Sequence, residues 1–353
     1  MFLPVGNVSV KSDYPLNSSF REQDWHILAG FWHPIAFEHD ITDKPVSTKL
    51  LDVDLVIYRT SQGISVAKDQ CPHRGVQVSR GQLVDDFLVC PMHGVHFDGG
   101  GRGCKVPSVP DQSSPISPKM CLHTYQTEIC YNIVWTCLKK NPIWPLPVWP
   151  GIEKPNYKKV FVPVDNWKTS ATRHTENFND QAHFPFVHLQ SFGSSKDLST
   201  HDYEVEETDF GLRFDYDYVE GGNRFPDGVE ADEREVVYTY ELTFPFSTLI
   251  YVDVQGSDFI HYFADAVSPV SADTTRIFQQ LTDTSGDPDP EYWINDSLQI
   301  LAEDKPLVES QPPQMPLETG PELHHIPADR WSIKYRQLLS ERFGLGLPDK
   351  DSR

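Results

Sequence analysis

The sequence predicts an α+β fold in two parts, a small all-β domain followed by a larger domain with an antiparallel sheet and helices. Short strand-like runs broken by Gly, Asp and Pro clusters fill most of residues 23–140. Longer runs that alternate polar and apolar residues follow after residue 200. Two amphipathic helical patterns close the chain. A length of 353 residues allows two domains, on a scale of about 150 residues each.

The N-terminal half divides into an arm and a compact domain. Residues 1–22 are predicted as an N-terminal arm and residues 23–145 as the first domain. The segment 141–157 (NPIWPLPVWPGIEKPNY) is dense in proline, which excludes a long helix or a central strand. It therefore marks the boundary, and residues 146–353 form the second domain. The strands expected in the first domain include 50–60, 63–69 and 132–138.

The second domain is expected to begin with a helical stretch at 169–188 and to continue as an antiparallel sheet. Alternation of polar and apolar residues predicts a sheet with one face on a core. Residues 291–311 form the strongest helical pattern and 328–344 a closing helix. The expected strands are 201–207, 212–220, 234–255, 259–270 and 275–283. The apolar positions of the first of these closing helices are Trp293, Leu298, Leu301, Leu307 and Val308.

Composition excludes several classes of protein. With 30 Lys and Arg against 51 Asp and Glu, the net charge is -21, which argues against a nucleic-acid-binding protein. No stretch approaches the ~20 apolar residues of a membrane-spanning helix, and the N-terminus lacks a signal-peptide pattern. The six cysteines suit a reduced compartment more than a disulfide framework. A cytoplasmic protein without membrane contact is expected.

Two short motifs each pair a cysteine with a histidine. Cys71-Pro-His73 and Cys90-Pro-Met-His93 have the form C-x-H and C-x-x-H. Two thiolates and two imidazoles in this order suit a Rieske [2Fe-2S] cluster, in which two histidines replace two cysteines on one iron. Structural zinc is the alternative, but zinc fingers usually group the two cysteines before the two histidines.

A second group of candidate metal ligands lies in ENFNDQAHFPFVH. Asp180 and His183 are three residues apart and would share a helix face. His183 and His188 are five apart, a rotation of roughly 140° on a regular helix, so the helix must bend or end for both to reach one metal. Pro185 supplies a cause, because it disrupts the preceding turn. Alternatively, the two histidines are ordinary polar residues.

The long helical pattern supplies a candidate third ligand. Two histidines and one carboxylate form the facial triad of non-haem Fe(II) oxygenases. Asp304 falls on the apolar face of the pattern, and a buried acid needs a partner. Glu303 and Glu309 are expected to point into solvent. We therefore select Asp304, with a buried Asp paired to Arg or Lys as the alternative.

Together, CPHRG…CPMHG and EN-x-x-D-x-x-H-x4-H resemble the catalytic α-subunits of Rieske non-haem iron oxygenases, over about residues 25–343. TENFNDQAHFPFVH, AEDKPLVESQ and DRWSIKYRQLL are most similar to methylxanthine N-demethylases, and similar to saxitoxin-pathway hydroxylases and aryl O-demethylases. The resemblance implies a helix-grip catalytic domain. It also implies that the Asp of the ED pair, Asp304, is the third iron ligand.

The resemblance implies a homotrimer in which the cluster of one subunit serves the iron of the next. Asp180 would bridge His93 of one subunit to His183 of its neighbour. The expected reaction is monooxygenation of a small aromatic or heterocyclic compound by O2 and two electrons. Attack on an N-methyl or O-methyl group would release formaldehyde. Electrons would come from NAD(P)H through a separate flavin or ferredoxin-type reductase, since this chain has no G-x-G-x-x-G motif of its own.

Three alternatives remain open. The same motifs fit a ring cis-dihydroxylating dioxygenase, a Rieske electron-transfer protein or a zinc-stabilised binding protein. Met92 and Val95 replace the aromatic residue and tryptophan that are common beside the cluster in this family, which bears on packing or docking there. The aromatic candidates for the substrate pocket are Phe210, Phe225, Phe246 and Tyr251, although aromatic residues are more often core.

Overall fold

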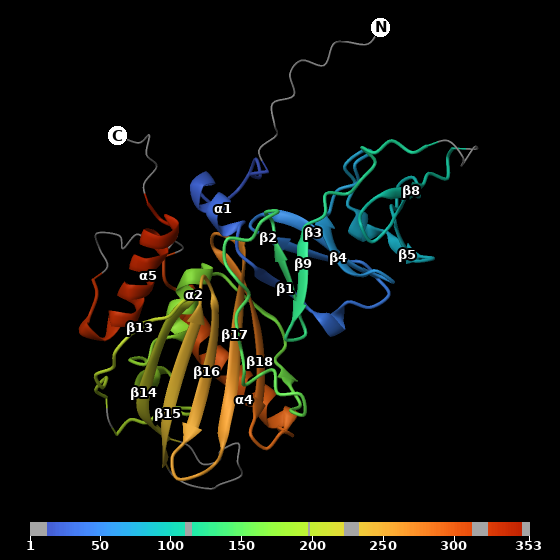
Figure 1. Cartoon of the computed structure of the whole chain (residues 1–353). Helices are drawn as coiled ribbons and strands as arrows, with labels where there is room; N and C mark the ends of the chain where they lie inside the picture. Colours follow the sequence, from blue (N-terminus) through green and yellow to red (C-terminus); the bar gives the residue numbers. More distant parts are fainter. Residues whose placement is uncertain (1–12, 110–114, 197, 222–232, 313–323, 348–353) are drawn as a thin grey trace.

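The computed structural model describes residues 13–109, 115–196, 198–221, 233–312 and 324–347. It confirms the predicted fold class (Figure 1): small antiparallel sheets form the N-terminal part, and a large antiparallel sheet with helices forms the C-terminal part. The arm predicted at 1–22 lies largely outside the described residues, and helix α1 (Glu22–Leu28) follows it. Among the described residues, no helix is long and apolar enough to cross a lipid bilayer.

Three small sheets build the N-terminal part. Their strand orders are β1-β10-β9, β2-β3-β4 and β5-β6-β7-β8. The predicted strand 50–60 is divided by a tight turn at Leu51 and Asp52, both with positive φ. The strands are β1 (His33–Phe37), β2 (Val46–Leu50), β3 (Val53–Thr60), β4 (Gly63–Lys68), β5 (Gln82–Val84), β6 (Phe87–Val89), β7 (His96–Phe97), β8 (Gly103–Lys105), β9 (Gln126–Cys130) and β10 (Ile133–Cys137). The 3-10 turns η1 (Glu38–Asp40) and η2 (Val78–Arg80) lie between them.

One sheet dominates the C-terminal part, in the order β11-β18-β17-β16-β15-β14-β13 with β12 also on β18. The predicted strand 234–255 is a hairpin, because the chain reverses at Phe244-Pro245-Phe246, and 201–207 contributes only its last two residues. The strands are β11 (Val160–Phe161), β12 (Asp165–Trp167), β13 (Glu206–Glu207), β14 (Gly211–Gly221), β15 (Glu233–Thr243), β16 (Ser247–Val254), β17 (Ile260–Ser271) and β18 (Thr274–Asp283).

The helical stretch predicted at 169–188 is two helices. Helix α2 (Ala171–Phe178) begins where Ser170 accepts a hydrogen bond from the Arg173 N–H. A single turn, α3 (Phe184–Val187), follows after a break. The helical stretch is interrupted just before Pro185, but not between His183 and His188 as expected. Pro185 lies in the first turn of α3, where its missing N–H has no helical partner to lose.

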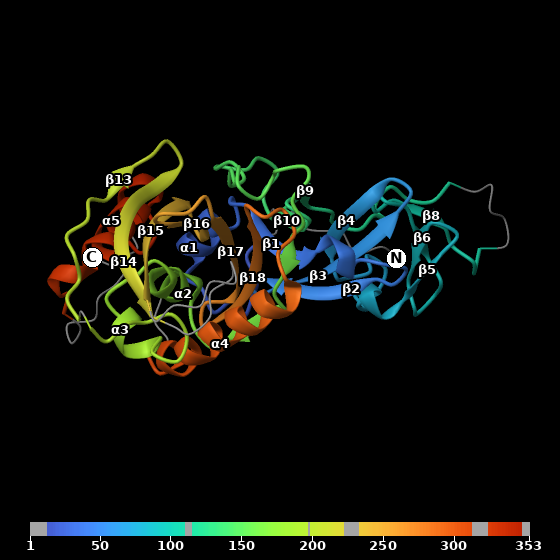
Figure 2. The same cartoon turned by 90° about the horizontal axis from the view of Figure 1, so that it is seen from below.

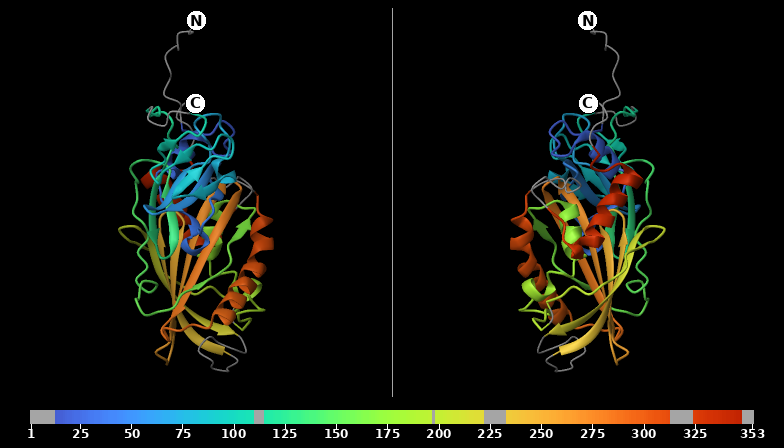
Figure 3. Two further views of the ribbon diagram at one scale, coloured as in Figure 1. Left: turned by 90° about the vertical axis from the view of Figure 1, so that its right-hand side faces the viewer. Right: turned by 90° about the vertical axis from the view of Figure 1, so that its left-hand side faces the viewer.

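Helix α4 (Pro290–Glu309) lies along one face of the large sheet (Figure 3). Its buried positions are Trp293, Ser297, Leu301, Asp304 and Val308. Trp293, Leu301 and Val308 join an apolar cluster with residues of β11 and β18. The predicted stripe was wrong at Leu298 and Leu307, which are 39% and 54% exposed. Asp304 therefore lies on the buried face, as its helical position predicted.

The proline-rich segment packs between the two parts of the chain. Trp149 and Ile152 share a buried apolar cluster with Trp135 of β10 and Tyr262 of β17. Helix α5 (Arg330–Phe343), preceded by η3 (Pro327–Asp329), packs Trp331 and other residues into the main core. A boundary between residues 145 and 146 stays a prediction. In Figure 2, the β5–β8 sheet and α3 lie at opposite ends of the molecule.

Candidate metal centres

The two cysteine-histidine motifs form loops with the same hydrogen bonds. In each loop the cysteine N–H donates to the carbonyl five residues later, at 2.8 Å for Cys71 and 2.9 Å for Cys90. The glycine four residues after each cysteine donates back to the cysteine carbonyl, at 2.8 and 3.0 Å. Gly75 and Gly94 have φ of 76° and 65°, which glycine adopts without strain. The repeated geometry turns both loops toward one place.

The loops bury their cysteines and expose their histidines. Cys71 and Cys90 are each 2% exposed, whereas His73 and His93 lie at the surface with ring centroids 4.7 Å apart. Burial, with the neighbouring Cys90, raises the pKa of the Cys71 thiol. A cationic iron centre would offset that cost by stabilising the thiolates. Two buried sulfurs beside two surface imidazoles thus suit a cluster whose histidine side faces outward.

The two departures from the family pattern have different surroundings. Met92 is 55% exposed, so an apolar side chain lies beside His93 on the surface. Val95 is buried and packs in the same apolar cluster as Cys71 and Cys90. Val95 therefore belongs to the core beneath the loops, and Met92 belongs to the surface through which the histidines are reached.

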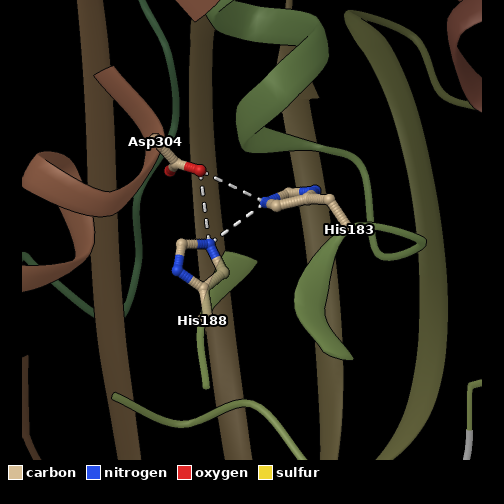
Figure 4. A group of neighbouring side chains, drawn as sticks. All are labelled: His183, His188 and Asp304. Carbon is tan, nitrogen blue, oxygen red and sulfur yellow. Dashed lines mark hydrogen bonds and ion pairs between the residues drawn. The ribbon is translucent and has the colours of Figure 1, made fainter. Parts of the chain in front are cut away.

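The structure brings His183, His188 and Asp304 together from α3 and α4 (Figure 4). The Nε2 atoms of the two histidines are 3.1 Å apart, and Oδ1 of Asp304 is 3.5 Å from the first and 3.4 Å from the second. The histidines stand at the two ends of α3, His183 at its N-cap and His188 at its C-cap. One turn of helix is therefore enough to aim both imidazoles at the carboxylate.

Outer carboxylates hold the protons of these imidazoles on the far nitrogen. His183 Nδ1 lies 2.8 Å from Asp180, and His188 Nδ1 lies 2.8 Å from Glu303. With Nδ1–H donated outward, both Nε2 atoms present lone pairs to the centre. Oδ1 of Asp304 is buried and has no hydrogen-bond partner among the described residues. The two Nε2 atoms and Oδ1 of Asp304 are three acceptors that converge on one point, an arrangement that suits a cation. A ligand set of two imidazole nitrogens and one carboxylate oxygen suits Fe(II).

The pKa shifts of Asp304 and His183 also indicate that this centre favours a positive charge. Burial alone would raise the pKa of Asp304, but the two histidines outweigh burial and lower it. Burial alone would lower the pKa of His183, but Asp180 and Asp304 outweigh burial and raise it to about 9. When no metal is bound, His183 is therefore protonated near neutral pH, and this proton supplies the positive charge that a metal would otherwise supply.

Glu303 is the site residue that sequence reasoning missed. It was expected in solvent, but its side chain is 9% exposed and its Oε2 also accepts a hydrogen bond from Ser191 Oγ at 2.7 Å. The chain after α3 covers this side of α4, which a helical face pattern does not reveal. Asp180 also differs from expectation, since it lies in the break between α2 and α3 and not on a shared helix with His183. Glu309 accepts from the Lys168 N–H at the surface.

Replacing Glu303 with glutamine is expected to weaken metal binding about 10–100-fold, the usual cost of losing the outer partner of a ligating histidine. The amide can no longer fix the His188 proton as a carboxylate does. Equilibrium dialysis against Fe(II) under anaerobic conditions measures the effect. Gln299→Ala is the control, because Gln299 touches Glu303 from the solvent side without contacting His188. Equal affinities for wild type and Glu303→Gln would contradict this role.

A cavity of about 130 Å³ opens beside the three converging side chains. Its walls come from α2, α3, α4 and the strands β14 to β17. Phe178, Ile250, Phe263 and Trp293 are among the apolar residues that line it. An apolar cavity in contact with a metal centre suits a small organic substrate.

The aromatic candidates for this pocket were wrong where the structure describes them. Phe210 is surface-exposed, Phe246 is buried in the main core, and Tyr251 donates a hydrogen bond to Glu241. These three do not line the cavity. Phe225 lies outside the described residues. Strand alternation alone does not say which face of a sheet is lined by a cavity and which by core.

Residues 167–343 match the family model described as the vanillate O-demethylase oxygenase C-terminal domain, and residues 31–126 match the Rieske [2Fe-2S] domain. The chain is a Rieske oxygenase catalytic subunit. The Rieske model covers both cysteine-histidine loops. The C-terminal model covers all three residues of the candidate iron site. This Rieske oxygenase thus has a [2Fe-2S] domain and a His-His-Asp candidate site for mononuclear iron.

Curated relatives of this Rieske oxygenase include N- and O-demethylases. It is 27% identical to methylxanthine N3-demethylase NdmB of Pseudomonas putida over 330 residues, 90% of each chain. It is 26% identical to a vanillate O-demethylase oxygenase subunit of a Pseudomonas species, over 57% of this chain and 53% of that one.

Two solved structures have a fold similar to that of this chain. Pseudomonas putida NdmA with caffeine superimposes with a TM-score of 0.80 at 26% identity, covering 90% of this chain and 92% of that chain. Dicamba monooxygenase bound to dicamba has a TM-score of 0.72 at 19% identity, covering 89% of this chain and 97% of that chain, which shows a shared fold.

Proposed function

We propose that this chain is the oxygenase component of a Rieske monooxygenase that hydroxylates or oxidatively demethylates a small aromatic or heterocyclic compound. The observation that carries the proposal is the convergence of His183, His188 and Asp304 on one point beside an apolar cavity. A Rieske electron-transfer protein has no use for this second centre or for the cavity. The demethylase relatives support the choice of reaction.

Two sets of residues hold the two groups. Cys71, Cys90, His73 and His93 would hold the [2Fe-2S] cluster, and His183, His188 and Asp304 would hold Fe(II). What these groups supply when bound is one-electron transfer by the cluster and activation of O2 by Fe(II). The balanced reaction is R–H + O2 + two electrons + two protons, giving R–OH + water. On a methyl group bound to N or O, the product then releases formaldehyde.

Asp180 and Glu303 act through the histidines. Each carboxylate keeps an Nδ1–H in place, so the Nε2 lone pairs stay directed at the metal position. The aromatic walls of the cavity exclude water from the reacting C–H bond.

Electron delivery is proposed to cross between two copies of the chain in a homotrimer. The cluster loops and α3 lie at opposite ends of one molecule (Figure 2), so the histidines of one cluster reach iron in a different copy. Asp180 is partly exposed and already accepts from His183, which leaves it able to accept from His93 of a neighbour. The domain boundary at 145/146 would separate the electron-supplying part from the oxidising part.

Turnover is expected to require a separate reductase. Reconstituted protein with NADH and substrate should give no product until a flavin or ferredoxin-type reductase is added. Caffeine and vanillate are suitable first substrates because relatives act on such methyl groups. Formaldehyde release indicates demethylation, a single added oxygen indicates hydroxylation, and a cis-diol would instead indicate dioxygenation. Product formation by NADH and this chain alone would contradict the need for a partner.

A further inference from the structure

The cavity has a polar end away from the candidate iron site, built by residues that the oxygenase reaction does not use. Asp296 lines the cavity from α4, eight residues before Asp304. At 1.5 Å per residue the two acids are ~12 Å apart along the helix axis and lie on one face. His261 of β17 lines the same cavity, with its ring 4.9 Å from that of Trp293.

A second acid at this end of the cavity, Glu220, already has a cationic partner. Glu220 is buried, and its Oε2 accepts from Arg234 Nε at 2.8 Å while its Oε1 accepts from the Tyr238 hydroxyl. Glu220 and Arg234 therefore balance each other in charge. Asp296, in contrast, has no hydrogen bond or ion pair with any residue that the structure describes, although it faces the cavity.

A second buried group in the same place lacks a partner. His261 is 7% exposed, and its Nδ1 makes no hydrogen bond within the described part of the chain. Burial, with a smaller contribution from Arg234, lowers the pKa of His261 to about 3, so its imidazole is neutral. A neutral imidazole offers an acceptor nitrogen. A buried polar group without a partner is costly, so a cavity ligand that donates an N–H to His261 would be stabilised by the new contact.

We propose, on the basis of the oxygenase function above, that Asp296 and His261 select substrates with a basic nitrogen, which binds as a cation with N–H groups directed at them. Asp296 supplies the charge and His261 a second acceptor, while the rings of Tyr292 and Trp293 in the cavity wall stabilise a cation further. The rest of the substrate then lies along the apolar walls toward the candidate iron site.

The electrostatics of the cavity favour a cation over an anion. Burial, and after it the carboxylates of Glu220 and Glu303, raise the pKa of Asp296 to about 7, against a smaller opposing effect of Arg234. A bound cation offsets these causes and restores the carboxylate. A carboxylated substrate would add another negative charge beside the acids and is disfavoured.

Three probes of nearly equal shape test this selectivity: benzamidine as the cation, benzamide as the neutral amide and benzoate as the anion. Their dissociation constants are measured by calorimetry on the anaerobic holoenzyme. Benzamidine is expected to bind at least about tenfold more tightly than benzamide, or about 1.4 kcal/mol. Benzoate should be the weakest. Because no turnover is involved, the result is independent of whether the chain proves to be an oxygenase.

Two variants test whether Asp296 causes the preference for the cation. Asp296→Asn should remove the advantage of benzamidine over benzamide and leave benzamide affinity within about threefold, since the change is nearly isosteric. Glu291→Gln is the matched control, an exposed acid of the same helix outside the cavity. Wild-type protein that binds benzamide or benzoate as tightly as benzamidine would overturn the proposal, as would an advantage retained by Asp296→Asn.

Discussion

Replacing Asp304 with alanine is expected to abolish substrate oxidation while leaving the visible spectrum of the [2Fe-2S] cluster intact. Loss of even an outer partner of a metal ligand costs 10–100-fold, so loss of the only carboxylate ligand should cost more than about a hundredfold. Iron analysis should fall from about three to about two atoms per chain, because only the mononuclear site is lost.

Glu309→Gln is the matched control for Asp304→Ala. It changes an acid one and a half turns along the same helix, and the amide oxygen can still accept from the Lys168 N–H. Turnover and iron content should equal those of wild type. If Asp304→Ala kept substrate oxidation and about three iron atoms per chain, Asp304 would not be an iron ligand. An electron carrier would instead show no substrate oxidation even as wild type.

Replacing Cys90 with alanine should produce the opposite pattern of metal loss. The variant loses a buried thiolate of the proposed cluster, so acid-labile sulfide and the visible spectrum should disappear and iron should fall to about one atom per chain. Turnover should be undetectable, since no electrons reach the second centre. Fe(II) binding at His183 and His188 should persist, because those residues lie in the other part of the chain.

Cys104→Ala is the control for Cys90→Ala, because it removes a cysteine that is not a proposed cluster ligand. Cys104 is a free, exposed thiol on β8 in the same part of the chain. Its loss should leave sulfide, spectrum and turnover unchanged. Zinc without labile sulfide in the wild-type protein would instead identify a zinc-stabilised protein and refute the cluster.

A mixture of the two inactive variants should recover activity if electrons cross between copies. In mixed trimers of Asp304→Ala and Cys90→Ala chains, an intact cluster of one copy lies beside an intact iron site of another. Co-expression with two different tags and two-step purification isolates these trimers. Recovery to a sizeable fraction of wild-type turnover supports transfer through Asp180 between subunits, and complete inactivity would contradict it.

Much of this protein was predictable from sequence because most of its candidate metal ligands lie in short, local motifs. A loop of five residues turns each cysteine and histidine pair, and the required glycines are part of the motif. The helical face of Asp304 followed from its spacing in α4, since helix geometry is local. The fold class followed from alternation in the strands for the same reason.

Contacts between distant segments were not predictable. Glu303 was expected in solvent because it lies outside the apolar face of α4, yet the chain after α3 covers it. Phe246 and Tyr251 were candidates for the pocket, but alternation does not distinguish the cavity from core or surface. Asp296 and His261 are 35 residues apart and have no motif in common, so only folding shows that they line one cavity.

The sequence by itself predicted the two sets of candidate metal ligands, the α+β fold class and the family. These features depend on residue types and on their spacing over a few positions, which can be read from the sequence before the fold is known. Only the tertiary structure decided which acids serve the histidines, where the cavity lies and which polar groups line its far end. The physical reason is that burial and lost hydration arise when segments from α2, α3, α4 and the sheet exclude water together, which no single segment does alone.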